Sequence, residues 1–94
     1  MITPRAALDI ENAARWYERE MPGLGDRFLD QLDATLNRIE QTLLIYRQRR
    51  GSVRLAMMRR FPFAVYFAVR NSEVHVLSVL HHARSDTTIE PNSS

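Results

Sequence analysis

The C-terminal half of this chain holds the side chains whose types and spacing could carry chemistry. They are Arg54, Tyr66, Arg70, His75, His81 and His82. Arginine binds carboxylates and phosphates through a planar fork and stays protonated at neutral pH, so it can hold an anion but cannot act as a base. Acid–base work would fall to Tyr66, His81 or His82, with arginine stabilising negative charge that develops on a phosphate.

The basic residues are unusual in kind. All thirteen are arginine, against eleven acidic residues, which leaves a formal net charge of +2. A cluster of them, Arg47, Arg49 and Arg50, precedes the first expected strand. Two interpretations stay open for this cluster: a solvated loop, and a contact surface for nucleic acid or an acidic partner.

Several classes of protein are excluded or disfavoured by what the sequence lacks. Cysteine is absent, which rules out disulfide scaffolds, thiolate zinc sites and cysteine nucleophiles. The three histidines lack metal-ligand spacing with carboxylates, and there is no phosphate loop or dinucleotide fingerprint, so we expect neither metal nor cofactor. The longest apolar stretch, residues 61–69, is far shorter than the roughly 20 residues of a membrane span. We expect a cytoplasmic protein without a membrane partner.

Two helices are expected first, within a single domain covering residues 1–94. Thr3 followed by Pro4 is typical of a helix start, and an apolar stripe from Ala7 to Met21 predicts a helix over about residues 4–20. A second stripe runs from Phe28 to Leu43, with Asp26 as its expected N-cap. The short turn between them predicts an antiparallel hairpin over about 4–43.

From Gly51 onward the apolar period changes to two, which is typical of strands. It predicts strands over about 53–58, 63–70 and 74–80, with a sheet over about 52–82 and a polar tail over 84–94. The last strand is apolar on both sides, so we expect it at the centre of the sheet. The fold class is therefore α+β: an N-terminal αα-hairpin packed on a small antiparallel β-sheet.

Strand alternation assigns side chains to the two faces of this sheet. We expect Val53, Leu55 and Met57 to lie under the helices with Phe63, Val65, Phe67 and Val69, and Val74, Val76 and Leu80 to join them. The open face, turned away from the helices, would then carry Arg54, Ala56, Met58, Ala64, Tyr66, Ala68, Arg70, His75, Leu77, Val79 and His81. Such a face could receive an anionic chain or a partner peptide, or could simply pack beneath the tail.

Short strings along the chain follow one another in a family order. They are residues 6–10 leading to Trp16-Tyr17-Glu18, Pro22-Gly23-Leu24-Gly25 with Phe28, Val53-Arg54, Arg60-Phe61-Pro62-Phe63 with Val65-Tyr66, and His81-His82-Ala83-Arg84. Together, from about residue 4 to 86, they resemble the RelE/ParE superfamily of toxins of bacterial type II toxin–antitoxin systems. The resemblance implies a helical hairpin on an antiparallel sheet.

The resemblance also implies a role and partners. It implies a small basic toxin that inhibits growth and serves in plasmid stabilisation. It also implies a cognate antitoxin, which wraps the toxin and forms a hetero-oligomer with it. RelE-like members cleave mRNA at the ribosome without metal, whereas ParE-like members bind DNA gyrase. The family's functional positions fall on Arg60, Tyr66, His81 and Arg84, with Arg54 as a further basic contact.

Three features depart from the family pattern, and two of these departures favour one branch. The N-terminal strand is reduced to Met1-Ile2, the tail has Ile89 where an aromatic residue is usual, and lysine is absent. Two interpretations stay open for the shortened strand: a sheet edge open to a partner, and a shortened gene start. The other two departures count against RNA cleavage. The leading hypothesis is a toxin that binds DNA gyrase. A ribosome-dependent endoribonuclease and an inactive antitoxin-binding module remain the alternatives.

Overall fold

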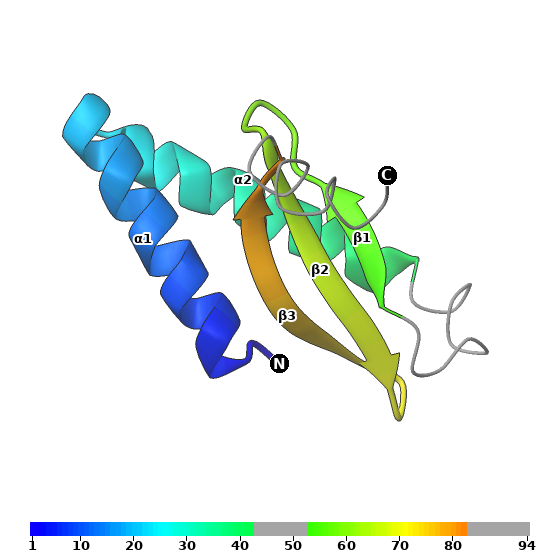
Figure 1. Cartoon of the computed structure of the whole chain (residues 1–94). Helices are drawn as coiled ribbons and strands as arrows, with labels where there is room; N and C mark the ends of the chain where they lie inside the picture. The colour runs from blue at the N-terminus through cyan, green and yellow to red at the C-terminus, as the bar shows by residue number, and fades with distance from the viewer. Residues whose placement is uncertain (43–52, 83–94) are drawn as a thin grey trace, which may run out of the picture.

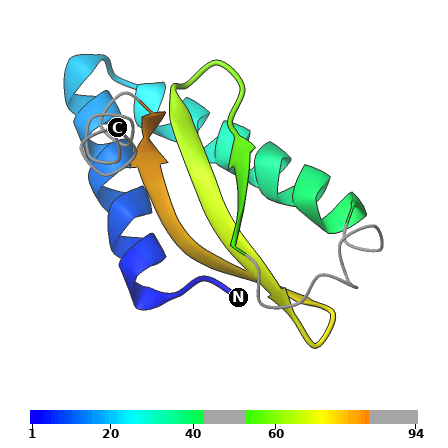
Figure 2. The ribbon, with the colours of Figure 1, turned by 45° about the vertical axis from the view of Figure 1, so that its right-hand side comes forward.

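The structure, a computed structural model, describes residues 1–42 and 53–82 (Figure 1). Two helices, α1 (Pro4–Glu20) and α2 (Leu24–Gln41), are followed by strands β1 (Arg54–Met57), β2 (Phe63–Arg70) and β3 (Glu73–His81). The strands form an antiparallel sheet in the order β1-β2-β3, and both helices lie on one side of it, as the turned view in Figure 2 also shows. The predicted α+β class, a helical hairpin on an antiparallel sheet, is confirmed.

The start of α1 is the one the sequence predicts. The Thr3 side chain accepts a hydrogen bond from the Ala6 backbone N–H at 3.2 Å, and Pro4 occupies the first helical position, where no N–H is needed. The start of α2 differs from the prediction. Its N-cap is Gly23, in the left-handed region at φ 89°, and Asp26 lies inside the first turn, so Asp26 as N-cap was wrong.

A side chain of α1 takes over the capping of α2. The Glu18 carboxylate accepts hydrogen bonds from the backbone N–H groups of Gly23 and Gly25, each at 3.0 Å. Gly25 must also be small, because a Cβ there would lie 2.7 Å from the backbone oxygen of Ala14. The tight turn between the helices is therefore fixed by one carboxylate and one close approach of backbones.

The hairpin meets the sheet through a cluster of aromatic rings. Tyr17 stacks on Phe28 at 5.5 Å between ring centroids and meets Phe61 edge-on at 4.9 Å. Phe28 in turn packs edge-on against Phe63 of β2 at 5.1 Å. The rest of the core extends along the helix side of the strands, with Leu32, Ile39, Val65, Phe67, Val69, Val74, Val76 and Val79 buried.

The centre of the sheet is β2, and the prediction that the last strand is central was wrong. β2 forms ladders with both β1 and β3. The outer edge of β3 pairs in parallel with the first residues of the chain: the Thr3 N–H donates to the Val76 carbonyl at 3.0 Å, and the Val76 N–H donates to the Met1 carbonyl at 2.8 Å. The shortened N-terminal strand thus still covers part of the edge that we expected to be open.

The side chains of β1 point opposite to the prediction. Arg54 lies opposite Phe67 and Leu55 opposite Tyr66, and residues directly opposite in a ladder share a face. Because Phe67 packs in the core, Arg54 is on the helix side and Leu55 on the open face. Apolar residues occupy both alternations in this segment, so the pattern alone could not choose between them. The side chains left exposed are Val53, Leu55 and Met57.

A β-bulge in β3 causes the second inversion. Tyr66 lies opposite Ser78 but Phe67 lies opposite Val76, so Leu77 is an extra residue in β3. One extra residue reverses the alternation beyond it. Val79, expected on the open face, is therefore only 2% exposed in the core. Leu80, expected in the core, lies on the open face, partly buried opposite Ala64.

Replacing Glu18 by alanine should destabilise the fold by about 1–2 kcal/mol, the usual cost of losing a helix cap, because two backbone N–H groups at the start of α2 lose their acceptor. Urea unfolding followed by circular dichroism measures this. Glu20→Ala is the matched control, since Glu20 is an exposed residue near the same helix end. Equal unfolding midpoints for the two variants would contradict the assignment.

Candidate functional site

The two side chains best suited to acid–base chemistry lie on opposite faces of the sheet. Tyr66 is on the open face, opposite Leu55 of β1 and Ser78 of β3. His81 lies opposite Phe63 on the helix side, and its ring meets the Phe63 ring edge-on at 5.2 Å between centroids. The expectation that Tyr66 and His81 share the open face was wrong, because the bulge at Leu77 moves His81 to the other side.

The predicted arginines are also dispersed. Arg54 lies partly buried on the helix side of β1, not on the open face. Arg60 is exposed in the connection between β1 and β2, where its backbone is left-handed at φ 70°. The remaining predicted contacts, Arg47, Arg49, Arg50 and Arg84, lie outside the described residues. The roles predicted for these residues stay predictions.

The open face is more apolar than the sequence pattern indicated. Leu55 and Met57 are 49% and 37% exposed, Tyr66 lies opposite Leu55, and Ala64 and Ala68 on the same face are buried. Polar groups gather at the turn end of β2 and β3 instead, where Nε2 of His75 lies 3.4 Å from Oε1 of Glu73. The open face therefore presents a small apolar surface formed by Leu55, Met57 and Tyr66.

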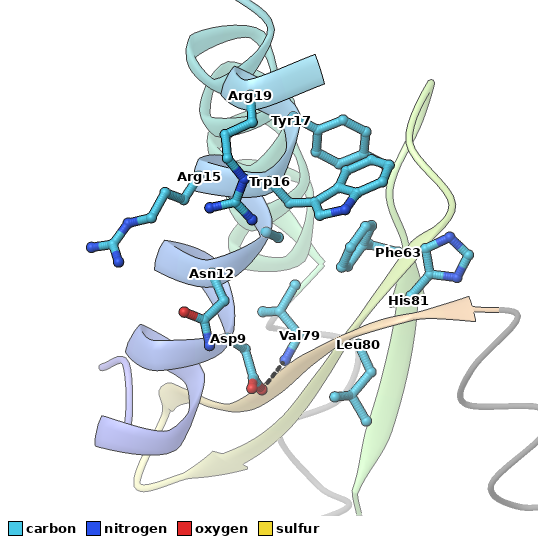
Figure 3. A pocket seen from close by; sticks show the side chains of 11 residues that line it. Asp9, Asn12, Arg15, Trp16, Tyr17, Arg19, Phe63, Val79, Leu80 and His81 are labelled. Atoms are coloured by element: carbon cyan, nitrogen blue, oxygen red, sulfur yellow. Dashed lines mark hydrogen bonds between the residues drawn. The ribbon is translucent and has the colours of Figure 1, made fainter. Parts of the chain in front are cut away.

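Sequence reasoning missed a hollow between α1 and the end of β3, which we call the α1–β3 groove (Figure 3). It encloses about 690 Å³, and its lining residues are Asp9, Asn12, Ala13, Arg15, Trp16, Tyr17, Arg19, Phe63, Val79, Leu80 and His81. A helical face could have indicated it, because Asp9, Asn12, Trp16 and Arg19 recur at steps of three and four. The other wall comes from Phe63 of β2 and from β3, where Val79 lies 70 residues after Asp9, and only folding brings it there.

The charges at one end of this groove are already engaged. Oδ2 of Asp9 accepts a hydrogen bond from the Val79 N–H at 3.0 Å, and Oδ1 faces Nε of Arg5 at 3.4 Å. Arg15 forms an exposed ion pair with Glu11 at 2.6 Å, a contact of small energetic value in water. Asp9 therefore acts as a clamp between α1 and the edge of β3.

Within 1–42 and 53–82, no three histidine, aspartate or glutamate side chains are grouped so that they could hold a metal ion. Neither described helix has the length and apolar character needed to cross a bilayer.

The sequence also matches a known protein family. The family model described as the ParE toxin of the type II toxin–antitoxin system, parDE, matches residues 1–86. The chain belongs to the ParE toxin family. No curated protein matches it. The toxin–antitoxin assignment made from the sequence strings is thereby confirmed, and membership in this family implies a cognate antitoxin as partner.

Two of the strings on which the family resemblance rests, Trp16-Tyr17-Glu18 and Arg60-Phe61-Pro62-Phe63, contain residues that stabilise the fold. In this ParE-family toxin, Tyr17 packs between α2 and the sheet, and Glu18 caps the turn formed by Gly23 and Gly25. Phe61 and Phe63 supply the other side of the same aromatic cluster. These strings mark the junction of hairpin and sheet, so they identify the family without identifying its target.

Because Tyr66 and His81 lie on opposite faces, their substitutions should act independently on stability. The coupling energy between Tyr66→Phe and His81→Ala should stay below about 0.5 kcal/mol. For comparison, Phe63→Leu and His81→Ala remove partners of one ring contact and should couple by about 0.5–1.5 kcal/mol. Urea unfolding of the two double-mutant cycles measures both energies, and a larger coupling for the Tyr66 pair would contradict the assignment to two faces.

Proposed function

We propose that this ParE-family toxin inhibits growth by binding DNA gyrase, and that its cognate antitoxin neutralises it by covering the same surface. The observation that carries the proposal is family membership over residues 1–86. The placement of Tyr66 and His81 on opposite faces supports a binding mechanism over RNA cleavage that uses both residues. The exposed apolar residues of the open face supply the contact surface.

RNA cleavage without metal needs an acid and a base within hydrogen-bond reach of one reacting phosphate. Side chains of a strand stand roughly perpendicular to the sheet, so Tyr66 and His81 project away from each other with the sheet backbone between them. One phosphate cannot contact both. This geometry counts against an endoribonuclease that uses both Tyr66 and His81. The absence of lysine from the chain counts against RNA cleavage as well.

The open face fits a protein partner for a second reason. Leu55 and Met57 are exposed on β1, an outer strand of the described sheet, with Tyr66 beside them. Burying such side chains stabilises a complex by about 25 cal/mol per Å² of apolar surface removed from water, before the costs of association. Aromatic residues and methionine are also enriched in protein interfaces. We assign Leu55, Met57 and Tyr66 to the contact with gyrase and antitoxin.

The proposal predicts that micromolar toxin inhibits DNA supercoiling by purified gyrase. Leu55→Arg should raise the inhibitory concentration at least tenfold, because a charge would be buried in the contact. Leu8→Arg on α1 is the matched control, with the same change at a leucine of similar exposure, 54% against 49%. Unaltered supercoiling with the folded wild-type toxin would refute the gyrase target, and equal loss in both variants would refute the assigned surface.

A second prediction separates the alternatives in cells. Induction of the toxin alone should slow growth, co-expression of the adjacent antitoxin gene should restore it, and His81→Ala should remain toxic because His81 lies away from the assigned surface. Primer extension on a translated message should give no new cleavage ends. New ends that disappear with His81→Ala would instead support an endoribonuclease. Tight antitoxin binding without toxicity would indicate an inactive module.

A further inference from the structure

The α1–β3 groove has a regular order of side chains along its helical wall. Asp9, Asn12, Trp16 and Arg19 follow one another at nearly one helical turn each, so the wall changes from acidic to amide to aromatic to cationic over about 15 Å. Figure 3 shows these side chains along α1, with Phe63 and His81 across from Trp16. Side chains arranged in this order along a groove can orient a ligand that has one flat apolar end and one anionic end.

The aromatic part of the groove presents fixed ring surfaces. Trp16 is 50% exposed, and its indole meets Tyr17 edge-on, with ring centroids 5.1 Å apart and planes at 86°. His81 is held in a similar way by Phe63, at 5.2 Å and 75°. Because Tyr17 and Phe63 are themselves packed in the core, the rings of Trp16 and His81 need little further ordering to receive a flat group.

The cationic part of the groove is Arg19. Arg15 is committed to Glu11, and both oxygens of Asp9 are occupied, one by the Val79 N–H and one by Arg5. Arg19 makes no ion pair with another residue of the described ranges 1–42 and 53–82. The groove therefore offers an anion a planar guanidinium, which Figure 3 shows near the level of Trp16, and the Asp9 carboxylate keeps anions away from the end where it binds the Val79 N–H.

We propose that the α1–β3 groove binds a nucleoside phosphate, with the base stacked on Trp16 and the phosphate on Arg19. The Asn12 amide, one turn before Trp16, supplies a donor and an acceptor for the base edge or the sugar. Stacking on an aromatic side chain tolerates any base, because every base has a π-face. The same chemistry is presented by a free nucleotide and by single-stranded nucleic acid.

Two features favour this ligand over an acidic peptide. An extended peptide would gain affinity by pairing with the edge of β3, but Val76 already pairs with residues 1–3 and the Val79 N–H is held by Asp9. A volume of about 690 Å³ also lies within the range of roughly 300–1,000 Å³ that is typical of small-molecule sites.

The test uses the fluorescence of Trp16, which is the sole tryptophan of the chain. The full-length toxin is titrated with uridine monophosphate, uridine, inorganic phosphate and a short oligouridylate, with excitation beyond the absorption of the base. We expect saturable quenching by the nucleotide and much weaker responses to uridine or phosphate alone. If the oligouridylate saturates the quenching at a lower concentration than uridine monophosphate, the ligand of the groove is single-stranded nucleic acid. If uridine monophosphate binds more tightly, the ligand is a free nucleotide.

Variants distinguish the site from general attraction of anions. Arg19→Gln should weaken nucleotide binding about tenfold, whereas Arg59→Gln, which removes an exposed arginine from the connection between β1 and β2, should leave it unchanged. Trp16→Leu, followed by calorimetry, should weaken it at least about fivefold through loss of stacking. Trp16 and Arg19 are exposed helix residues, so both variants should stay folded, which circular dichroism checks.

Three results would overturn the proposal. They are an unquenched Trp16 at millimolar nucleotide, equal weakening by Arg19→Gln and Arg59→Gln, and quenching by an oligoglutamate peptide but not by the nucleotide. The last would identify the groove as a peptide site. The experiment needs neither gyrase nor antitoxin, so its failure would leave the proposed function standing, and loss of gyrase inhibition would not affect this binding.

Discussion

The rest of this structure depends on the contact of Tyr17 with Phe28, Phe61 and Phe63. This ring cluster holds the hairpin on the sheet, and each such pair contributes about 0.5–1.5 kcal/mol beyond the burial of its surface. Successive helix residues point about 100° apart, so fixing Tyr17 in the core also fixes its neighbours. Trp16 is turned into the α1–β3 groove and Glu18 toward the start of α2. Three consecutive residues thus serve three different parts of the molecule.

The same contact divides the sheet into two faces with different properties. The face under the helices carries the core and, at its margin, His81 in the groove. The open face carries Leu55, Met57 and Tyr66, which no described helix covers. The described residues 1–42 and 53–82 therefore carry two surfaces of unlike chemistry, an apolar one on the open face and a concave, aromatic one lined by both arginine and aspartate. Tyr17, Glu18, Phe61 and Phe63 of the family strings belong to the junction between these surfaces, whereas Trp16 and His81 reach the groove and Tyr66 reaches the open face.

The helices could be predicted from the sequence because their determinants are local. Thr3, Pro4 and the apolar stripe fix α1 within its own segment, and the predicted bounds match Pro4–Glu20. The sides of the strands could not be predicted in the same way. In β1 apolar residues occupy both alternations, and the extra residue at Leu77 shows itself only through the pairing of β2 with β3. Moving His81 across the sheet changed the candidate site more than any other error.

The two outer strands of the described sheet are protected by helix side chains, and this bears on how partners bind. Asp9 of α1 holds the Val79 N–H of β3, and Arg38 of α2 donates to the Met57 carbonyl of β1 at 2.8 Å. A partner that added a strand at either position would first have to break one of these bonds. Each such loss costs about 1–3 kcal/mol if the charged group finds no replacement. A partner that packs on the side chains of the open face breaks neither. Edge protection and apolar exposure therefore favour the same mode of recognition, through the face of the sheet rather than through its edges.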